Sequence, residues 1–259
     1  MEIWSSPEFD AHEKVIFVAD RETGLRAIIA IHDTTMGPAG GGCRMWPYET
    51  TQAALDDVLR LSRAMTYKLA FIGARYGGGK AVIIGDPHKD KTEALLRAMA
   101  RAVDKLNGAM TISEDVGLTV EDLVTFRKET QYVVGLPGQS GDTSPPTAYG
   151  IFCGLKSCLR HGLGRESFDG VHVAIQGLGN VGFRLAEHLS RAGARLTVAD
   201  TVPERVARAE TELGAASVAV DAIYEVAADI FAPCALGGAI NDETVPRLRV
   251  KVVAGAANN

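Results

Sequence analysis

The stretch Val171-His-Val-Ala-Ile-Gln176, followed directly by Gly177-Leu-Gly179-Asn-Val-Gly182, decides the fold of this 259-residue chain. Its first half is a short apolar run typical of a buried strand, and its second half has the glycine spacing GxGxxG. A helical stretch and a second apolar run, 195–199, follow it. This order predicts a dinucleotide-binding βαβ unit, because the second glycine lets the pyrophosphate approach and the helix N-terminus attracts it.

The end of the second apolar run indicates which dinucleotide is bound. Asp200 lies 23 residues after Gly177, near the offset of about 20 residues at which a carboxylate binds the adenosine ribose. We therefore predict NAD rather than NADP. Two alternatives stay open: Asp200 serves only a turn, and Arg205 accommodates the extra phosphate of NADP. The cofactor-binding residues predicted here are Gly177, Gly179, Asn180, Val181, Gly182 and Asp200.

The same alternation of apolar runs and helical stretches continues through the second half of the chain. Apolar runs at 171–175, 195–199, 229–232 and 250–254 alternate with helical stretches, which predicts a doubly wound parallel sheet of the Rossmann type. The segment 135–146 is so rich in glycine and proline that we expect neither continuous helix nor central strand there.

The predicted fold class is therefore α/β with two domains. Residues 1–144 form an α/β substrate and catalytic domain, and residues 145–259 form a Rossmann domain that binds NAD and is incomplete at its C-terminus.

Local signals outline the first domain. Runs 14–18 and 25–31 flank a turn-rich segment and predict a hairpin. Thr50 or Thr51 is expected to cap a helix with an apolar face, and a second helix is expected over 92–106. Further on, 110–112 predicts a strand and Thr119 opens a third helix with a capping box.

Composition excludes several classes of partner. The net charge is −5, with acidic and basic residues interspersed, so we expect neither nucleic-acid nor membrane binding. The 4 cysteines and 6 histidines show no ligand spacing, so no metal site is predicted. With no signal-peptide pattern after Met1, a cytoplasmic protein is expected.

Two lysines in the first domain carry the chemistry. Lys80 follows three glycines, but a phosphate-binding Walker loop needs an earlier glycine and a following Ser or Thr, where this chain has Ala74 and Ala81. That reading is rejected. Lys68 stands in Met65-Thr-Tyr-Lys68, near the end of the first helix.

Motifs in order along nearly the whole chain resemble one family, the Glu/Leu/Phe/Val dehydrogenases. They are Gly37-Pro-Ala-Gly-Gly-Gly-Cys-Arg-Met45, Met65-Thr-Tyr-Lys68, Gly77-Gly-Gly-Lys80, Glu114-Asp115-Val-Gly117, Thr147-Ala-Tyr-Gly150, the GxGxxG turn, Ala232-Pro-Cys-Ala-Leu-Gly237 and Ala254-Gly-Ala-Ala-Asn-Asn259. The resemblance implies NAD-dependent oxidative deamination of an apolar L-amino acid and a homo-oligomeric enzyme.

The resemblance also implies roles for single residues. Lys68 binds the substrate carboxylate, as a compact ammonium can. Lys80 is the general base on water, which requires a neutral amine that burial and a nearby Lys68 would favour. Asp115 exchanges protons with the amine, and Asn259 orients substrate and cofactor. The remaining substrate-binding residues are Gly40, Gly41, Met65 and Ser113, and the remaining cofactor-binding residues are Thr147, Ala235 and Leu236.

Substrate size and chain length leave alternatives open. Leucine-specific relatives carry a bulkier residue in place of Gly40, so a larger cavity is expected unless another group fills it, and this favours an aromatic or mixed specificity. Leucine, valine, phenylalanine and tryptophan all stay open. The resemblance also implies that relatives continue beyond Asn259. The alternatives are therefore a truncated, catalytically silent module for NAD binding or oligomerisation, and a different Rossmann enzyme.

Overall fold

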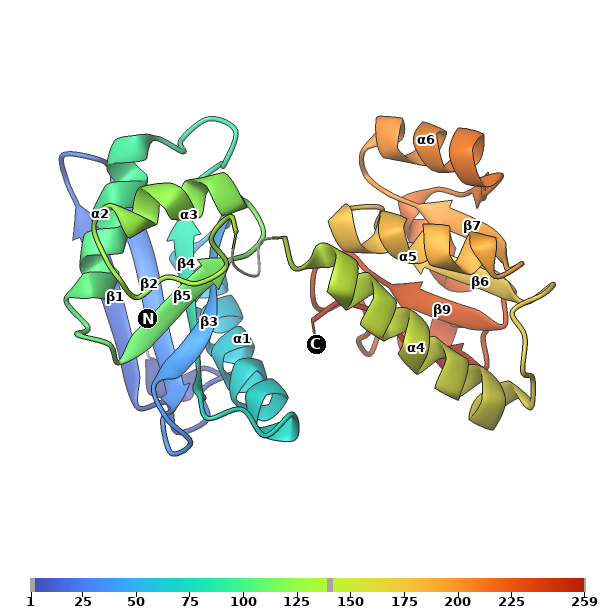
Figure 1. Ribbon diagram of the computed structural model, residues 1–259, viewed down its shortest axis with the longest axis horizontal. Coiled ribbons are helices and arrows are strands. Elements are labelled where there is room, and N and C mark those ends of the chain that lie inside the picture. The colour runs from blue at the N-terminus through green and yellow to red at the C-terminus, as the bar shows by residue number, and fades with distance from the viewer. Residues whose placement is uncertain (1–2, 139–141, 259) are drawn as a thin grey trace. The chain divides into compact units, whose positions relative to one another are not determined.

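A computed structural model describes residues 3–138 and 142–258 of the chain. It divides the chain into two compact units, Met1–Asp142 and Thr143–Asn259. The division falls within the glycine- and proline-rich segment 135–146. Each unit has its own core and is described by itself (Figure 1).

The first unit is built on a mixed five-stranded sheet. The antiparallel hairpin predicted at its start is confirmed, and β2 and β4 are also antiparallel, whereas β3 runs parallel to both β4 and β5. The strand order is β1-β2-β4-β3-β5, which makes β1 and β5 the edges. The strands are β1 (Lys14–Asp20), β2 (Leu25–Asp33), β3 (Ala39–Trp46), β4 (Gly77–Ile84) and β5 (Met110–Glu114).

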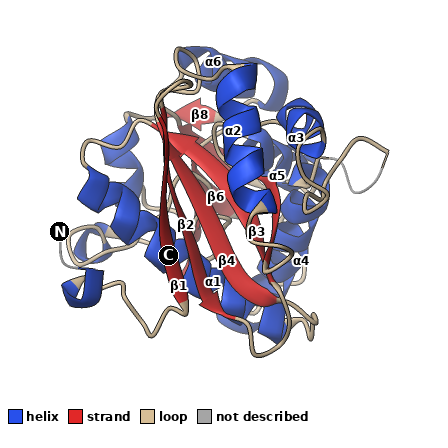
Figure 2. Ribbon diagram, turned by 90° about the vertical axis from the view of Figure 1, so that its left-hand side faces the viewer, coloured by secondary structure: helices blue, strands red, loops and turns tan. Residues whose placement is uncertain are grey.

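Helices cover both faces of this sheet (Figure 2). Helix α1 (Thr51–Phe71) packs on one face through Leu55, Val58 and Leu59, whereas α2 (Glu93–Asp104) and α3 (Val120–Arg127) pack on the other. The three predicted helix starts are confirmed, because Thr50, Thr92 and Thr119 are the N-caps, the last within a capping box completed by Asp122. A short 3₁₀ turn, η1 (Ile3–Ser5), precedes them.

Strand β3 was not predicted from the sequence. It contains Gly40, Gly41 and Gly42, and glycine weakens a strand because it has no side chain to pack. The strand forms nonetheless between two parallel neighbours, β4 and β5. Alternation along the strand directs Ala39, Cys43 and Met45 into the core under α2 and α3, so that positions 40, 42 and 44 face α1.

The second unit is an open parallel sheet, as predicted. Its strands β6 (His172–Gln176), β7 (Arg195–Ala199), β8 (Ala216–Ser217), β9 (Ile230–Pro233) and β10 (Val252–Val253) are all paired in parallel. The strand order is β10-β9-β6-β7-β8. Counted along this unit, that order is 5-4-1-2-3, which is the first five strands of the doubly wound dinucleotide fold. The order reverses between β6 and β9.

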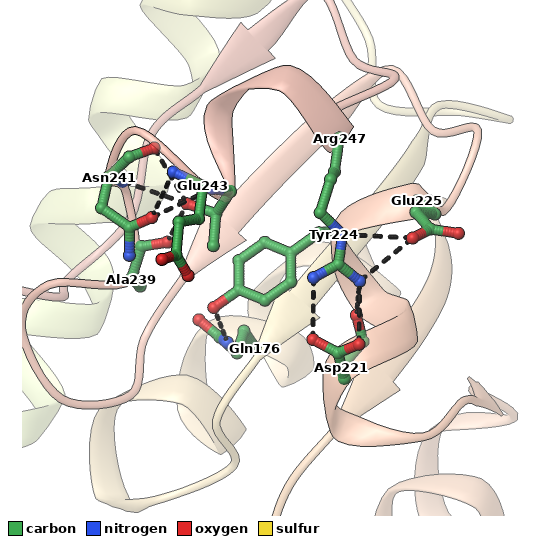
Figure 3. A network of polar contacts seen from close by, with 9 residues as sticks. Gln176, Asp221, Tyr224, Glu225, Ala239, Asn241, Glu243 and Arg247 are labelled. Atoms are coloured by element: carbon green, nitrogen blue, oxygen red, sulfur yellow. Dashed lines mark hydrogen bonds and ion pairs between the residues drawn. The ribbon is translucent and has the colours of Figure 1, made fainter.

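The two faces of this sheet are covered differently. Helices α4 (Ser144–Leu163), α5 (Asn180–Arg191) and α6 (Pro203–Leu213) contribute to the core on one face. The other face packs against the 3₁₀ turn η2 (Val220–Glu225) and the segment around Leu248 and Val250, after η3 (Val245–Arg247). Arg247 ties this cover together through ion pairs with Asp221 and Glu225 (Figure 3).

The described residues 135–138 and 142–143 lie in neither helix nor strand, which agrees with the expectation for the linker. Helix α4 begins at Ser144, so the last residues of the segment 135–146 are helical. Pro145 and Pro146 lie in its first turn, where the missing N–H groups would have no helical partner and the fixed φ suits a helix. Within residues 3–138 and 142–258, no helix has the length and apolar character needed to cross a bilayer.

Candidate active site

The centre of the candidate site is the ion pair between Lys80 and Asp115. Lys80 lies on β4 and is only 6% exposed, and its Nζ pairs with Oδ2 of Asp115, which directly follows β5. Strand β3 runs between β4 and β5, and its Gly42 lies directly against the pair. A Cβ atom at Gly42 would lie 3.1 Å from Lys80 Nζ and 2.8 Å from Asp115 Cβ. The Lys80–Asp115 pair can therefore pack this closely against β3 only because position 42 has no side chain.

The same face of the sheet has two more bare positions. A Cβ atom at Gly78 would collide with Thr66 on α1, so the helix and β4 are in close contact there. A Cβ atom at Gly40 would make ordinary contacts with the side chains of Tyr76, at 3.7 and 3.9 Å, and Leu69, at 3.8 Å. The floor of the site therefore consists of glycine backbone beside the Lys80 amine, and Tyr76 and Leu69 fill part of the space that the sequence left open beside Gly40.

The other predicted substrate residues lie around this floor. Lys68 is exposed on the last turns of α1, in the part of the helix whose Thr66 and Leu69 contact the glycine strands. Ser113 pairs in register with Gly42 on the neighbouring strand. Gly41 faces away, and a Cβ atom there would collide with the carbonyl of Gly79, so its role is to allow close strand packing. Met65 is half-buried on α1.

Electrostatics in the site depend on residues that the sequence did not reveal. The Nε of the buried Arg44 lies 3.3 Å from Asp115 Oδ2, and its Nη1 lies 2.8 Å from Asp57 Oδ2 on α1. Burial alone would raise the pKa of Asp115, but the ammonium of Lys80 and the guanidinium of Arg44 hold that pKa below its ordinary value. Arg44 occurs in the quoted family motif, and its place two residues after Gly42 would have put it on the same face.

The glycine turn of the second unit fits a dinucleotide. Gly177 has a φ of +91°, and a Cβ atom there would lie 2.7 Å from Ala235 N. A Cβ atom at Gly182 would collide with the carbonyl oxygen of Gly177, so the helix packs tightly on the strand. Gly179, the N-cap of α5, has no atom within 4 Å of its Cβ position. The three glycines thus provide a tight turn, an open approach to a helix N-terminus and close packing, as a bound pyrophosphate requires.

Asp200 has a structural task in this turn. Its Oδ2 accepts a hydrogen bond from Leu178 N at 2.6 Å, its Oδ1 accepts one from Val202 N at 2.8 Å, and its side chain is only 6% exposed. Arg205 Nη1 lies 3.7 Å from Oδ1. Asp200 therefore stabilises the turn, which was one of the two alternatives for this residue. A hydrogen bond from the ribose would use the remaining lone pairs of its carboxylate.

The remaining cofactor residues occupy different places in the second unit. Ala235 lies against Gly177, just after β9, so the loops after β6 and β9 meet at the point where the strand order reverses. Ligands bind at such a switch point in open α/β sheets. Leu236 follows in the same loop, Asn180 and Val181 begin α5, and Thr147 is exposed in the first turn of α4. Asn259 lies outside the described residues.

Comparison with known proteins identifies the family. Residues 12–136 match the model of the Glu/Leu/Phe/Val dehydrogenase dimerisation domain. Over 262 aligned residues the chain is 52% identical to the leucine dehydrogenase of Geobacillus stearothermophilus, covering 100% of this chain and 71% of that one. The chain belongs to the Glu/Leu/Phe/Val dehydrogenase family. It is also 51% identical to the phenylalanine dehydrogenase of Lysinibacillus sphaericus over 256 residues, covering 96% and 67% of the two chains.

Solved structures of this dehydrogenase family agree. The chain is 45% identical to the L-tryptophan dehydrogenase of Nostoc punctiforme, with a TM-score of 0.69 and coverage of 96% and 71%. The hetero-hexameric glutamate dehydrogenase of Thermus thermophilus, at 21% identity and a TM-score of 0.79, shares the fold. The predictions of the family, of an α/β fold and of an amino-acid dehydrogenase acting on CH–NH₂ donors are thus confirmed.

Proposed function

We propose that this dehydrogenase uses NAD to deaminate an apolar L-amino acid oxidatively, yielding a 2-oxo acid, ammonia and NADH. One observation carries the proposal: the buried Lys80–Asp115 pair faces a strand that is bare at Gly42, where a Cβ atom would lie 3.1 Å from the lysine nitrogen. An acid and a base thus lie side by side against glycine backbone. The named relatives of this chain act on leucine and phenylalanine, which are both apolar amino acids.

The residues of the first unit divide the work as follows. The ammonium of Lys68 pairs with the substrate carboxylate and fixes the amino acid over the glycine floor. Asp115 takes a proton from the substrate's amino group. When the α-carbon has been oxidised to an imine, Lys80 removes a proton from water, whose oxygen adds to that carbon. Asp115 returns a proton to the nitrogen, which leaves as ammonia while the oxygen becomes the keto group of the product.

The second unit supplies the cofactor site. Gly177, Gly179 and Gly182 shape the turn for the pyrophosphate, and Asn180 and Val181 present the N-terminus of α5 to it. NAD, when bound, accepts the hydride of the substrate's α-carbon. A cavity of about 290 Å³ opens beside Gly179 and Asn180. Because Arg205 lines that cavity, acceptance of NADP is the alternative outcome of a cofactor assay.

The side-chain pocket is assigned to the space beside Gly40. Tyr76 and Leu69 lie at contact distance from a Cβ atom there, so this wall is apolar and partly aromatic. Ser113, which pairs with Gly42 two residues further along β3, adds one hydroxyl, which donates to the carbonyl of Glu114 at 3.4 Å. The wall therefore suits leucine, valine and phenylalanine, and tryptophan is the largest substrate to test.

We further infer that the enzyme is a homo-oligomer. The matched family model is described as a dimerisation domain and covers residues 12–136. Within that range β1 is an edge strand, and its Phe17 is 47% exposed, so the edge offers both unpaired backbone groups and an aromatic side chain. Light scattering after size exclusion gives the mass, and a monomer would contradict this inference.

NADH formation with a panel of L-amino acids tests the proposed function. The panel contains leucine, valine, phenylalanine, tryptophan and glutamate. Lys80→Ala is expected to lower kcat by about 10² to 10⁴, the range of general-base catalysis. Lys68→Ala is expected to raise KM for the amino acid. Lys89→Ala is the matched control, since that side chain is 80% exposed and its ion pair within the described residues is with Asp86.

Two outcomes contradict the proposal. Unchanged turnover in Lys80→Ala excludes the assigned base. No turnover with any substrate, together with measurable NAD binding, means that the chain is a silent dinucleotide-binding module.

A further inference from the structure

Arg44 is a buried cation held between two carboxylates. It lies on β3 and is 4% exposed. Its Nη1 donates to Asp57 Oδ2 at 2.8 Å, and its Nε donates to Asp115 Oδ2 at 3.3 Å. Burial of a guanidinium is costly unless it is paired, so both carboxylates are needed to keep it there. The side chain therefore links the reacting pair to α1.

Asp57 is itself held firmly. Tyr48 Oη donates to its Oδ2 at 2.6 Å, and Arg60 Nη2 donates to its Oδ1 at 2.6 Å. With Arg44, three donors from β3, α1 and the loop between them converge on one carboxylate. Such a network fixes the guanidinium in position, since any rotation would break charge-assisted hydrogen bonds. The hydrogen bonds around Asp57 thus hold the Arg44 guanidinium in place beside Asp115.

The Asp115 carboxylate needs a counter-charge throughout the proposed reaction, and Arg44 can supply it when Lys80 cannot. Asp115 Oδ2 is shared by Lys80 and Arg44. Asp115 must be ionised when it takes the proton of the substrate's amino group, and Lys80 must already be neutral to act next as the base on water, so at that first step Lys80 does not balance the carboxylate. A buried carboxylate without a counter-charge would take up a proton instead. A guanidinium keeps its charge at any working pH, so Arg44 still balances Asp115 when Lys80 does not.

We propose that Arg44 is a positioning residue for deamination: it supplies the permanent positive charge that keeps Asp115 ionised and aimed while Lys80 is neutral. The proposal rests on the proposed function, because it takes Lys80 as the base and Asp115 as its partner. It assigns Arg44 no contact with the substrate.

Other groups around Asp115 do not replace Arg44. The Cys43 thiol is fully buried, and burial, followed by the charge of Asp115, raises its pKa, so it stays protonated. Burial and the Asp57 carboxylate likewise raise the pKa of Tyr48. The Arg60 guanidinium donates to Asp57 rather than to Asp115. Within the described residues, Lys80 and Arg44 are the cations that form ion pairs with Asp115.

The test is the pH profile of kcat/KM for three variants, which are expected to shift its ascending limb in different directions. Arg44→Met removes the positive charge beside the reacting pair, so the ascending limb moves to higher pH, with kcat lowered by about 10² or more. Asp57→Asn removes the opposing negative charge, so the ascending limb moves to lower pH. Arg44→Lys keeps the charge, so the limb stays near its wild-type position while kcat falls modestly. KM for the amino acid changes less than kcat in all three.

A purely structural role would not give opposite pH shifts. The inference is overturned if Asp57→Asn and Arg44→Met move the limb in the same direction, or if neither moves it. Should Arg44→Met fail to fold, as judged by circular dichroism, Arg44→Lys and Asp57→Asn still decide: a limb unmoved by Asp57→Asn overturns the inference. Lys80→Ala and Asp115→Asn are assayed in parallel. If those two keep full turnover, the proposed function has failed; if they lose it, only the role of Arg44 is being judged.

Discussion

Gly40 and Gly42 face the same side of β3, yet alanine should affect them differently. At Gly40 the new Cβ atom would meet Tyr76 and Leu69 at 3.7 and 3.8 Å, which is ordinary contact. At Gly42 it would lie 2.8 Å from Asp115 Cβ and 2.9 Å from the carbonyl oxygen of Glu114. These atoms belong to the backbone or lie next to it, so no side-chain rotation relieves the overlap. The strand end that carries Asp115 must move instead.

The expected magnitudes follow from these contacts. Gly42→Ala displaces Asp115 from Lys80, and a shift of about 1 Å in a reacting group can cost about 10² in rate, so kcat should fall by at least that factor for every substrate. Gly40→Ala only removes space beside Tyr76. One methylene in a pocket is worth about 1 to 3 kcal/mol, so kcat/KM for tryptophan should fall about 10-fold or more relative to valine.

The assay is NADH formation with valine, leucine, phenylalanine and tryptophan, for both variants and the wild type. Thermal unfolding checks that each variant is folded, with Gly40→Ala expected within about 1 kcal/mol of the wild type. A Gly42→Ala enzyme that keeps wild-type kcat would refute the geometry of the reacting pair. A Gly40→Ala enzyme that loses activity equally with valine and tryptophan would refute the pocket.

Three further predictions concern the pocket wall, the cofactor turn and acid stability. Tyr76→Ala should raise kcat/KM for tryptophan relative to valine, because it opens the wall beside Gly40; steady-state kinetics would contradict this if the ratio fell. Gly182→Ala should weaken NAD binding at least 10-fold in calorimetric titration, since its Cβ collides with the Gly177 carbonyl; wild-type affinity would contradict it. The pKa of Asp115 is lowered in the folded protein, so the stability it contributes is present above its unfolded pKa of about 3.9 and is lost as the pH falls through the folded value. In urea unfolding at several pH values, Asp115→Asn should therefore be less stable at neutral pH but lose less on acidification, and parallel curves would contradict this.

Much of the second unit could be predicted from the sequence, because its information is local. The GxGxxG turn, the strand before it and the helix after it are contiguous, and each has its own periodicity or spacing. Strand β8, with two residues, was missed, since so short a strand has no period to detect. Helix α4 begins inside the glycine- and proline-rich segment, at Ser144, because prolines exclude the middle of a helix but not its first turn.

The first unit was harder, because its site depends on pairing between distant segments. Strand β3 has the glycine content of a loop, and only its position between β4 and β5 makes it a strand. Lys80 and Asp115 were predicted as separate residues, but nothing in the sequence states that they form an ion pair. Arg44 and Asp57 were missed altogether, since a charged residue within a strand or helix is usually solvated, and their burial follows from packing alone.

Strand β3 also bears on how the enzymes of this family diverge. Substrate size is assigned to Gly40 and the reacting pair to Gly42, two residues apart on one rigid strand. A mutation at the first position can change which amino acid fits without moving Lys80 or Asp115. Single mutations at position 40 can therefore change the substrate specificity while the reacting pair stays in place. Glycine at position 42 is required whichever amino acid is bound.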